Sequence, residues 1–484
     1  MMKNLLTYNL FLWIFLCCSS CSSKKDETTQ KKHPNILWIV SDDLGTDLGC
    51  YGNSLVKTPH LDQLAKQSIL FTNMHSVTAV CSPNRSSLIT GVYPTSIDCH
   101  QHRTQFKKPL PDSIRPITDY LKKAGYFVSN GDSKNKSKKG KTDYNFIHNS
   151  DSLFDGTHWS QRKKGQPFFA QIQIYNPHRP FKRDTLNPIN PDFIQLPPYY
   201  PNHKLAQKDW AYYLESVQLV DREVGKILKD LENDGLLDNT IIFFFGDQGR
   251  PHLRSKQFLY DGGINTPLLI KGIKNKKGIV DTQLVSTVDI PAMTLALANI
   301  SIPNYIAGLN ILDSTLSRNH IFSMRDRRDE TVDRIRAIRT QNFKYIKNYY
   351  PNRPYTQPNV YKKFQYPMLT LMRVLSKQKL LTPEQAQFLA TNRPKEELYD
   401  LKNDPFELYN LAEISQFQTQ KDELDSLLKY YVKKYDQGVY PEPKSETDYA
   451  SKIMQERWIK RMKKRGLSPN ITDEEYLEYF EKNY

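Results

Sequence analysis

The segment NILWIVSDDLG, residues 35–45, joins a short apolar run to two adjacent carboxylates. An apolar, β-branched run without alternating polar residues is typical of a parallel strand that is buried on both faces. Comparable runs occur at YFVSN (126–130), PFFAQIQIYNPH (167–178) and NTIIFFFGDQG (239–249), and each ends in a polar or glycine-containing loop. We therefore expect several buried strands, one of which delivers Asp42 and Asp43 at its carboxyl end.

Helical patterns separate these runs. Apolar residues recur at three- and four-residue spacing in residues 58–68, 117–124 and 208–233. This alternation predicts a doubly wound α/β domain with a mostly parallel sheet, in which ligands bind beyond the carboxyl ends of the strands.

The pattern changes after about residue 334. RIRAIRTQNFKYIKNYY (334–350) alternates as a hairpin does, and it is followed by ELYDLKNDPFELYNLA (397–412) and a helical end rich in Lys and Tyr. We expect a catalytic domain at residues 33–334 and a smaller α+β domain with a helical tail at residues 335–484.

The composition limits the class of partner. The chain has 484 residues, 38% of them hydrophobic, which is enough for a core and argues against disorder. Its formal net charge of +16 favours an anionic partner such as nucleic acid, membrane or sulfated polysaccharide. The lysine-rich stretch at 133–141 lacks the interleaved aromatic residues of a single-strand platform and matches no groove-binding helix. Nucleic acid is therefore disfavoured.

The N-terminus has the features of an export signal. The apolar run at residues 10–16 follows an early lysine and is shorter than the roughly 20 residues of a transmembrane helix. The small residues and cysteines after it resemble a bacterial lipobox, with Cys21 expected to carry the lipid and Cys18 as the alternative. We expect a signal peptide at 1–21, a tether at 22–32, and an exported, lipid-anchored protein in the periplasm or at the outer-membrane surface.

Three cysteines remain after the signal, Cys50, Cys81 and Cys99, so at least one is unpaired even if Cys50 and Cys99 pair. Cys81 opens CSPNRSSLITG (81–91), which resembles the sulfatase motif Cys-x-Pro-x-Arg followed by x-x-Leu-x-Thr-Gly at every defining position. In sulfatases this cysteine is oxidised after translation to formylglycine, whose hydrated aldehyde is the nucleophile. The resemblance implies formylglycine at residue 81, a maturation enzyme as a partner, and an alkaline-phosphatase-like fold.

The strand ends offer three carboxylates and one amide oxygen, from Asp42, Asp43, Asp247 and Gln248. Such a set suits a hard divalent cation rather than zinc. Resemblance to sulfatases assigns these four residues and residue 81 to a calcium site, with magnesium as the less favoured ion. Gln248 departs from the Asn or His that is common there in the family, but it retains an amide oxygen.

The same resemblance implies catalytic roles for four further residues. Arg85 would bond the formylglycine and the metal site, and Lys141 and Lys256 would contact the sulfate. His178, in YNPHRPF (175–181), would be the general acid that faces the leaving oxygen. Asp143 stands where many members have the His of a Gly-Lys-x-His motif, so either this carboxylate or another residue must help to remove the diol proton.

The resemblance does not say which residues would line the sugar pocket, so the candidates are chosen by their position alone. These are the basic residues near the motifs: His100, His102, Arg103, His252 and Arg254. The order of elements is similar to that of N-sulfoglucosamine sulfohydrolases, and sulfated algal glycans are an equally open substrate class.

Three hypotheses follow for the function. The first is a sulfatase that removes sulfate ester or N-sulfate groups from sulfated saccharides. The second keeps formylglycine and the metal but hydrolyses phosphonate or phosphate esters. The third is a non-catalytic lipoprotein that binds sulfated polysaccharide.

Overall fold

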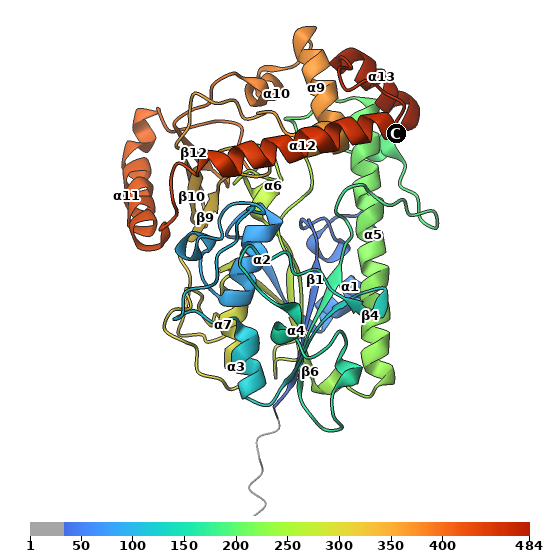
Figure 1. Cartoon of the computed structure of the whole chain (residues 1–484), viewed down its shortest axis with the longest axis vertical. Coiled ribbons are helices and arrows are strands. Elements are labelled where there is room, and N and C mark those ends of the chain that lie inside the picture. Colours follow the sequence, from blue (N-terminus) through green and yellow to red (C-terminus); the bar gives the residue numbers. More distant parts are fainter. Residues whose placement is uncertain (1–32) are drawn as a thin grey trace, which may run out of the picture. The chain divides into compact units, whose positions relative to one another are not determined.

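The largest element of the computed structural model, which describes residues 33–484, is a mixed, mostly parallel sheet with the strand order β4-β3-β5-β1-β6-β7-β2-β8 (Figure 1). Its strands are β1 (Asn35–Ser41), β2 (Ser68–His75), β3 (Phe127–Asp132), β4 (Asn135–Lys139), β5 (Phe168–Ile174), β6 (Thr240–Gly246), β7 (Leu268–Lys271) and β8 (Ile279–Ser286). β7 is antiparallel to β6 and β2, and β4 is antiparallel to β3. The prediction of a doubly wound, mostly parallel α/β sheet is confirmed.

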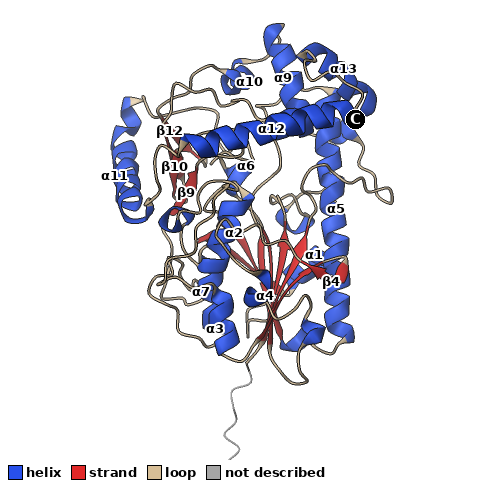
Figure 2. Cartoon of the chain, in the orientation of Figure 1, coloured by secondary structure: helices blue, strands red, loops and turns tan. Residues whose placement is uncertain are grey.

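Helices cover both faces of this sheet (Figure 2). The side chains of β1 alternate between the two faces, and those on each face belong to a separate apolar cluster. Leu37 and Ile39 pack with side chains of α1 (Pro59–Lys66) and α5 (Lys204–Asn233). Trp38 and Val40 point to the other face. They pack with side chains of α2 (Cys81–Thr90), α3 (Ile117–Lys123) and α7 (Asp289–Leu297). A central strand that is apolar on both faces is thus held between two helical layers.

The second sheet is smaller and antiparallel, in the order β12-β11-β10-β9. Its strands are β9 (Ile321–Arg325), β10 (Ile335–Arg339), β11 (Phe343–Asn348) and β12 (Glu396–Asp400). The predicted hairpin is the β10–β11 pair, with Ala337 opposite Ile346. Apolar residues of this sheet pack against α11 (Gln418–Tyr435), so the smaller α+β region is confirmed.

The other helices are α4 (Ser150–Leu153), α6 (Asp261–Ile264), α8 (Val360–Gln365), α9 (Pro367–Lys377), α10 (Pro383–Ala386), α12 (Lys444–Lys464) and α13 (Asp473–Asn483). In Figure 1, α12 crosses above α2, on the side of the large sheet to which β1 runs. The Glu446 carboxylate of α12 accepts hydrogen bonds from the backbone N–H groups of Gln105 and Phe106, at 2.8 and 3.2 Å. This contact brings the C-terminal helices to the edge where a ligand is expected.

Residues 34–484 form one compact unit. Within the described part of the chain, every helix is too short or too polar to cross a membrane. The signal peptide, the lipidation sites at Cys21 and Cys18 and the tether lie outside the described residues and stay predictions.

Candidate active site

Three buried carboxylates meet at the carboxyl ends of β1 and β6, which are adjacent parallel strands with Ser41 opposite Gly246. Asp42, Asp43 and Asp247 each offer an oxygen within 4.8 Å of the others. Asp43 has a left-handed backbone (φ 62°), which is uncommon for a residue other than glycine and is found at functional sites. Its N–H donates to Oδ1 of Asp247 at 2.9 Å. The backbone thus brings like charges together.

The chemistry of this cluster fits a hard cation. Oδ1 of Asp42 and Oε1 of Gln248 are buried and have no hydrogen-bond partner among residues 33–484. Burial and the charge of Asp42 raise the pKa of Asp247 to about 7. Buried oxygens that lack a hydrogen bond, beside crowded carboxylates, are what a divalent ion with oxygen ligands would satisfy. The four predicted metal-binding side chains therefore lie together and fit an ion of this kind.

Cys81 is the first residue of α2 and is buried, with a pKa raised by burial despite the nearby Lys141. Arg85, one turn later, joins this helix to the acidic cluster: its Nε donates to Oδ2 of Asp247 at 2.9 Å, and its Nη1 donates to Oε1 of Gln173 at 2.7 Å. The predicted position of Arg85, one helical turn from residue 81, is observed.

Two lysines pair with the two aspartates that follow β1. Nζ of Lys141 lies 2.7 Å from Oδ2 of Asp42, and Nζ of Lys256 lies 2.7 Å from Oδ1 of Asp43. Burial raises the pKa of Asp42, but Lys141 and other cations outweigh it and hold this pKa well below its usual range. Burial raises the pKa of the Cys81 thiol, and the charges of Lys141 and Lys256 act in the opposite direction.

His178 faces the same cluster. Its Nδ1–H donates to the carbonyl of Arg179 at 2.6 Å, which leaves Nε2 3.7 Å from Oδ2 of Asp43. Burial and Lys256 lower the pKa of His178 to about 4, so the imidazole is neutral at pH 7 without a bound anion. Arg179 is held by Asp209 at 2.6 Å, and this ion pair fixes the loop.

His102 lies against the thiol, a position that sequence reasoning did not assign to it. Its Nε2 is 3.8 Å from Sγ of Cys81, and its Nδ1 is 3.0 Å from Oδ1 of Asp329. Burial and Arg103 lower the pKa of His102 to about 3. The neutral ring therefore donates Nδ1–H to Asp329 and directs the lone pair of Nε2 toward residue 81.

Asp143 is close to Cys81 and His102 but is held by a cation. Both of its oxygens accept hydrogen bonds from Arg103, at 2.9 and 3.0 Å. Burial raises its pKa, but Lys141 and Arg103 outweigh this and lower it. Asp143 thus positions Arg103 and is a weaker proton acceptor than its place in the motif suggests.

Three residues that were predicted to line the sugar pocket are engaged elsewhere. His100 is buried and packs beside Tyr440, with ring centroids 5.3 Å apart. His252 stacks on Trp210 at 4.4 Å. Arg254 donates to the backbone carbonyl of Phe406 at 2.8 Å. Their contacts are those of buried structural residues, whereas His102 and Arg103 line a cavity that is bounded on its other side by α12.

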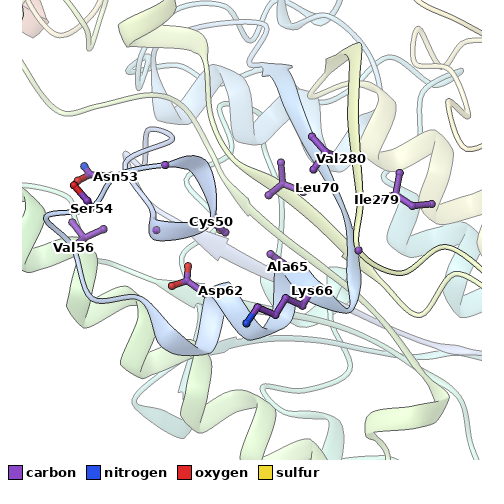
Figure 3. Close-up of a pocket in the computed structure, with 13 residues that line it drawn as sticks. Cys50, Asn53, Ser54, Val56, Asp62, Ala65, Lys66, Leu70, Ile279 and Val280 are labelled. Atoms are coloured by element: carbon purple, nitrogen blue, oxygen red, sulfur yellow. The ribbon is translucent and has the colours of Figure 1, made fainter.

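A separate cavity of about 670 Å³ lies between α1, β2 and β8 (Figure 3). Figure 3 shows Cys50 and Asp62 on one side of it and the apolar side chains of Leu70, Ile279 and Val280 on another. Its lining includes no predicted site residue, so it is distinct from the candidate active site. Cys50, Cys81 and Cys99 are all free thiols.

Comparison with known proteins agrees with this geometry. The model of the sulfatase family matches residues 34–300, and that of the N-sulphoglucosamine sulphohydrolase C-terminal region matches residues 249–368. An ulvan-active sulfatase of Formosa agariphila is 33% identical over 475 residues, which cover 85% of this chain and 78% of that protein. Human N-sulphoglucosamine sulphohydrolase is 28% identical over 316 residues, which cover 56% of this chain and 62% of that protein.

The fold itself is shared more widely. A solved phosphonate monoester hydrolase of Silicibacter pomeroyi superposes with a TM-score of 0.62 at 17% identity, over 83% of this chain and 96% of that one. Such a likeness shows the fold alone. The sulfatase family model, however, spans more than half of this chain, and its match includes Cys81, Arg85 and the aspartate cluster. On these grounds the chain belongs to the sulfatase family.

Proposed function

We propose that this sulfatase removes sulfate ester or N-sulfate groups from an acidic polysaccharide, with formylglycine at residue 81 and calcium held by Asp42, Asp43, Asp247 and Gln248. The observation that carries the proposal is the meeting of the N-terminus of α2 with the carboxylate cluster, where Arg85 contacts Asp247 at 2.9 Å. The raised pKa of the Cys81 thiol supports it too, because an unmodified thiol of this kind is a poor nucleophile.

The absent groups would each supply one kind of chemistry. A formylglycine at residue 81 would supply a hydrated aldehyde as the nucleophile. Calcium would supply a fixed positive charge that polarises a sulfate oxygen. Magnesium suits the cluster less well, because it requires near-ideal octahedral geometry and retains its waters.

The residues of the chain stabilise the charge of the sulfate. Lys141 and Lys256 pair with Asp42 and Asp43 on either side of the cluster, and a sulfate bound there would be held between two ammonium groups. Arg85 fixes the position of residue 81 against Asp247. These cations are preorganised by their carboxylates, so they require little rearrangement as charge develops on the oxygens of sulfur.

Two histidines move the protons. His178 gives a proton to the leaving oxygen through Nε2. Because its Nδ1–H already donates to the carbonyl of Arg179, Nε2 must be protonated before it can act as the acid. A bound sulfate that offsets the charge of Lys256 would raise the pKa of His178 and make this protonation easier. His102 accepts a proton from residue 81 through Nε2, with its tautomer fixed by Asp329, and so replaces the histidine that is missing from GKTDYN.

The substrate is proposed to be ulvan or a polysaccharide like it. The relative from Formosa agariphila that is 33% identical to this chain acts on ulvan. The net charge of +16 supports a polyanionic substrate, because opposite charge raises the local concentration of such a chain. The signal and lipobox support an exported protein that is anchored by lipid at Cys21 or Cys18, outside the cytoplasm where a polysaccharide would be met.

Release of inorganic sulfate tests the proposal. Protein that has been matured by a formylglycine-generating enzyme is given calcium and a panel of saccharides, each sulfated at a single position. An aryl phosphonate runs in parallel. Sulfate release in which kcat/KM exceeds that for the phosphonate supports the proposal, and preferential turnover of the phosphonate contradicts it.

A further inference from the structure

Another cavity, of about 210 Å³, lies between the loop that follows α2 and the C-terminal helix α12. Its lining includes His102 and Arg103 on the loop, and Tyr449, Met454 and Arg457 on α12. Because His102 lies 3.8 Å from Cys81, the cavity adjoins the reacting centre. Helix α12 lies beyond residues 34–300 and 249–368, the ranges that the family models match.

The acidic groups of this cavity are already engaged. Glu446 accepts the backbone N–H groups of Gln105 and Phe106, and Asp329 pairs with His102. Two of the cations are neutralised as well: Arg103 is paired with Asp143, and Arg327 with Glu442, at 2.9 Å in both cases.

Arg457 differs from these cations. Among residues 33–484, no carboxylate lies within ion-pair distance of its guanidinium. Its Nη1 donates a hydrogen bond to Sδ of Met454 at 3.7 Å. One turn later, the guanidinium of Arg461 lies over the ring of Phe364 at 4.5 Å and likewise has no carboxylate partner in the described chain. The wall of α12 therefore presents an uncompensated guanidinium to a cavity whose own acids are occupied.

Aromatic side chains accompany this charge. Tyr449 lines the cavity with 40% of its surface exposed. The ring of Phe106 is 70% exposed, and its backbone N–H donates to Glu446, which also lines the cavity. An exposed ring next to a free guanidinium suits a sugar, because the apolar face of a pyranose packs on an aromatic ring while Arg binds an oxyanion in bidentate geometry.

We propose that this cavity binds the sugar next to the one whose sulfate reacts, and that Arg457 holds an anionic substituent of that neighbouring sugar, a carboxylate or a second sulfate. This inference rests on the proposed function, since it assumes a sulfated saccharide at residue 81. It makes the protein an enzyme for acidic oligosaccharides rather than for single sugars. It also assigns specificity to a helix outside the matched family regions.

Three disaccharides test the assignment. All carry the same sulfated sugar; the neighbouring sugar bears a uronate, a sulfate or, after reduction of the uronate, a neutral alcohol. We expect kcat/KM of the wild type to be about tenfold or more higher for the preferred anionic disaccharide than for the neutral one, as for other hydrogen bonds to charged groups. Arg457→Gln should remove most of this preference. The matched control is Lys460→Gln, an exposed cation on the same helix that does not line the cavity.

A binding measurement separates this proposal from the proposed function. Calorimetry with the uronate and sulfate disaccharides that lack the scissile sulfate requires no turnover. Binding that weakens about tenfold in Arg457→Gln but not in Lys460→Gln supports the cavity even if no sulfate is released. Equal affinity of the wild type and Arg457→Gln for both anionic ligands, or equal kcat/KM for all three substrates, overturns it. Failure to hydrolyse any substrate contradicts the proposed function alone.

Discussion

Nε2 of His102 lies 3.8 Å from Sγ of Cys81, at the end of a chain of contacts that begins at the carboxylate of Asp329. Asp329 lies in the connection between β9 and β10 of the small antiparallel sheet, Cys81 begins helix α2, and His102 lies in the loop between α2 and α3. The imidazole that lies against residue 81 thus comes from a different part of the chain than Asp143, and in the proposed mechanism it takes the place of the missing histidine.

Replacement of His102 should lower kcat without unfolding the protein. We expect His102→Gln to lower kcat for a sulfated saccharide by about 10²–10⁴-fold, the usual contribution of a positioned general base. Asp143→Asn is the comparison, with a smaller loss, because that carboxylate is committed to Arg103. A larger loss in Asp143→Asn than in His102→Gln would assign the proton transfer to Asp143 instead.

The loss of activity on replacement of His178 should depend on the leaving group of the substrate. A sugar alkoxide needs a proton to leave, whereas a nitrophenolate leaves readily without one. We expect His178→Asn to lower kcat/KM for a saccharide sulfate by about 10²–10⁴-fold, and to lower it much less for nitrophenyl sulfate. Steady-state kinetics on both substrates measures the difference. Equal losses on the two substrates would show that His178 positions the sulfate and does not protonate the leaving oxygen.

Calcium binding should depend on pH through Asp247. Burial and Asp42 raise the pKa of this carboxyl to about 7 in the metal-free protein, so below pH 7 a proton competes with the ion. Titration calorimetry should therefore show calcium affinity falling as the pH drops from 8 to 6, with proton release on binding. An affinity that is unchanged over this range would mean that Asp247 is already ionised without the metal.

The same shift predicts how stability responds to metal removal. Because the folded-state pKa of Asp247 lies above its value in the unfolded chain, the metal-free protein should lose stability as the pH rises through 7. Calcium at 100 times its dissociation constant should add about 2.7 kcal/mol to the free energy of unfolding. Denaturant unfolding at pH 6 and pH 8, with calcium and with a chelator, measures both effects. A destabilising effect of calcium would contradict the site.

Replacement of Lys256, the proposed sulfate ligand, should lower activity far more than replacement of an exposed lysine. Lys256 is buried and pairs with Asp43, whereas Lys138 is exposed on β4 and pairs with Asp132 at 3.2 Å. We expect Lys256→Met to lower kcat/KM by at least about 100-fold, as for other preorganised donors, and Lys138→Gln to have little effect. Similar activities of the two variants would place the sulfate away from Lys256.

The sequence predicted the central sheet and the acidic cluster because both depend on local patterns. Apolar runs that end in Asp42 and Asp43, or in Asp247, mark strands and their carboxyl ends without knowledge of the tertiary structure. Parallel strands place those ends at one edge, so the cluster follows from the fold class. The antiparallel β7 escaped this reasoning, because the four-residue strand Leu268–Lys271 is too short to show a period.

The contacts of the histidines could not be predicted in this way. His100 and His102 are two residues apart in a loop, yet one packs on Tyr440 and the other on Cys81. Loops carry no periodicity that reveals the direction of a side chain, and Asp329, which orients His102, lies 227 residues away. The proposed role of Arg457 could not be predicted either, because it depends on how α12 crosses the edge of a sheet that is formed by earlier residues.

The central claim concerns residue 81, and one sample can test it. Protein that has been co-expressed with a formylglycine-generating enzyme is divided between mass spectrometry of the peptide that contains residue 81 and an assay of sulfate release with and without calcium. The account predicts an aldehyde at residue 81 and release of sulfate that a chelator abolishes. An aldehyde without sulfate release from any sulfated saccharide at saturating calcium, or full activity with residue 81 as a thiol, would contradict it.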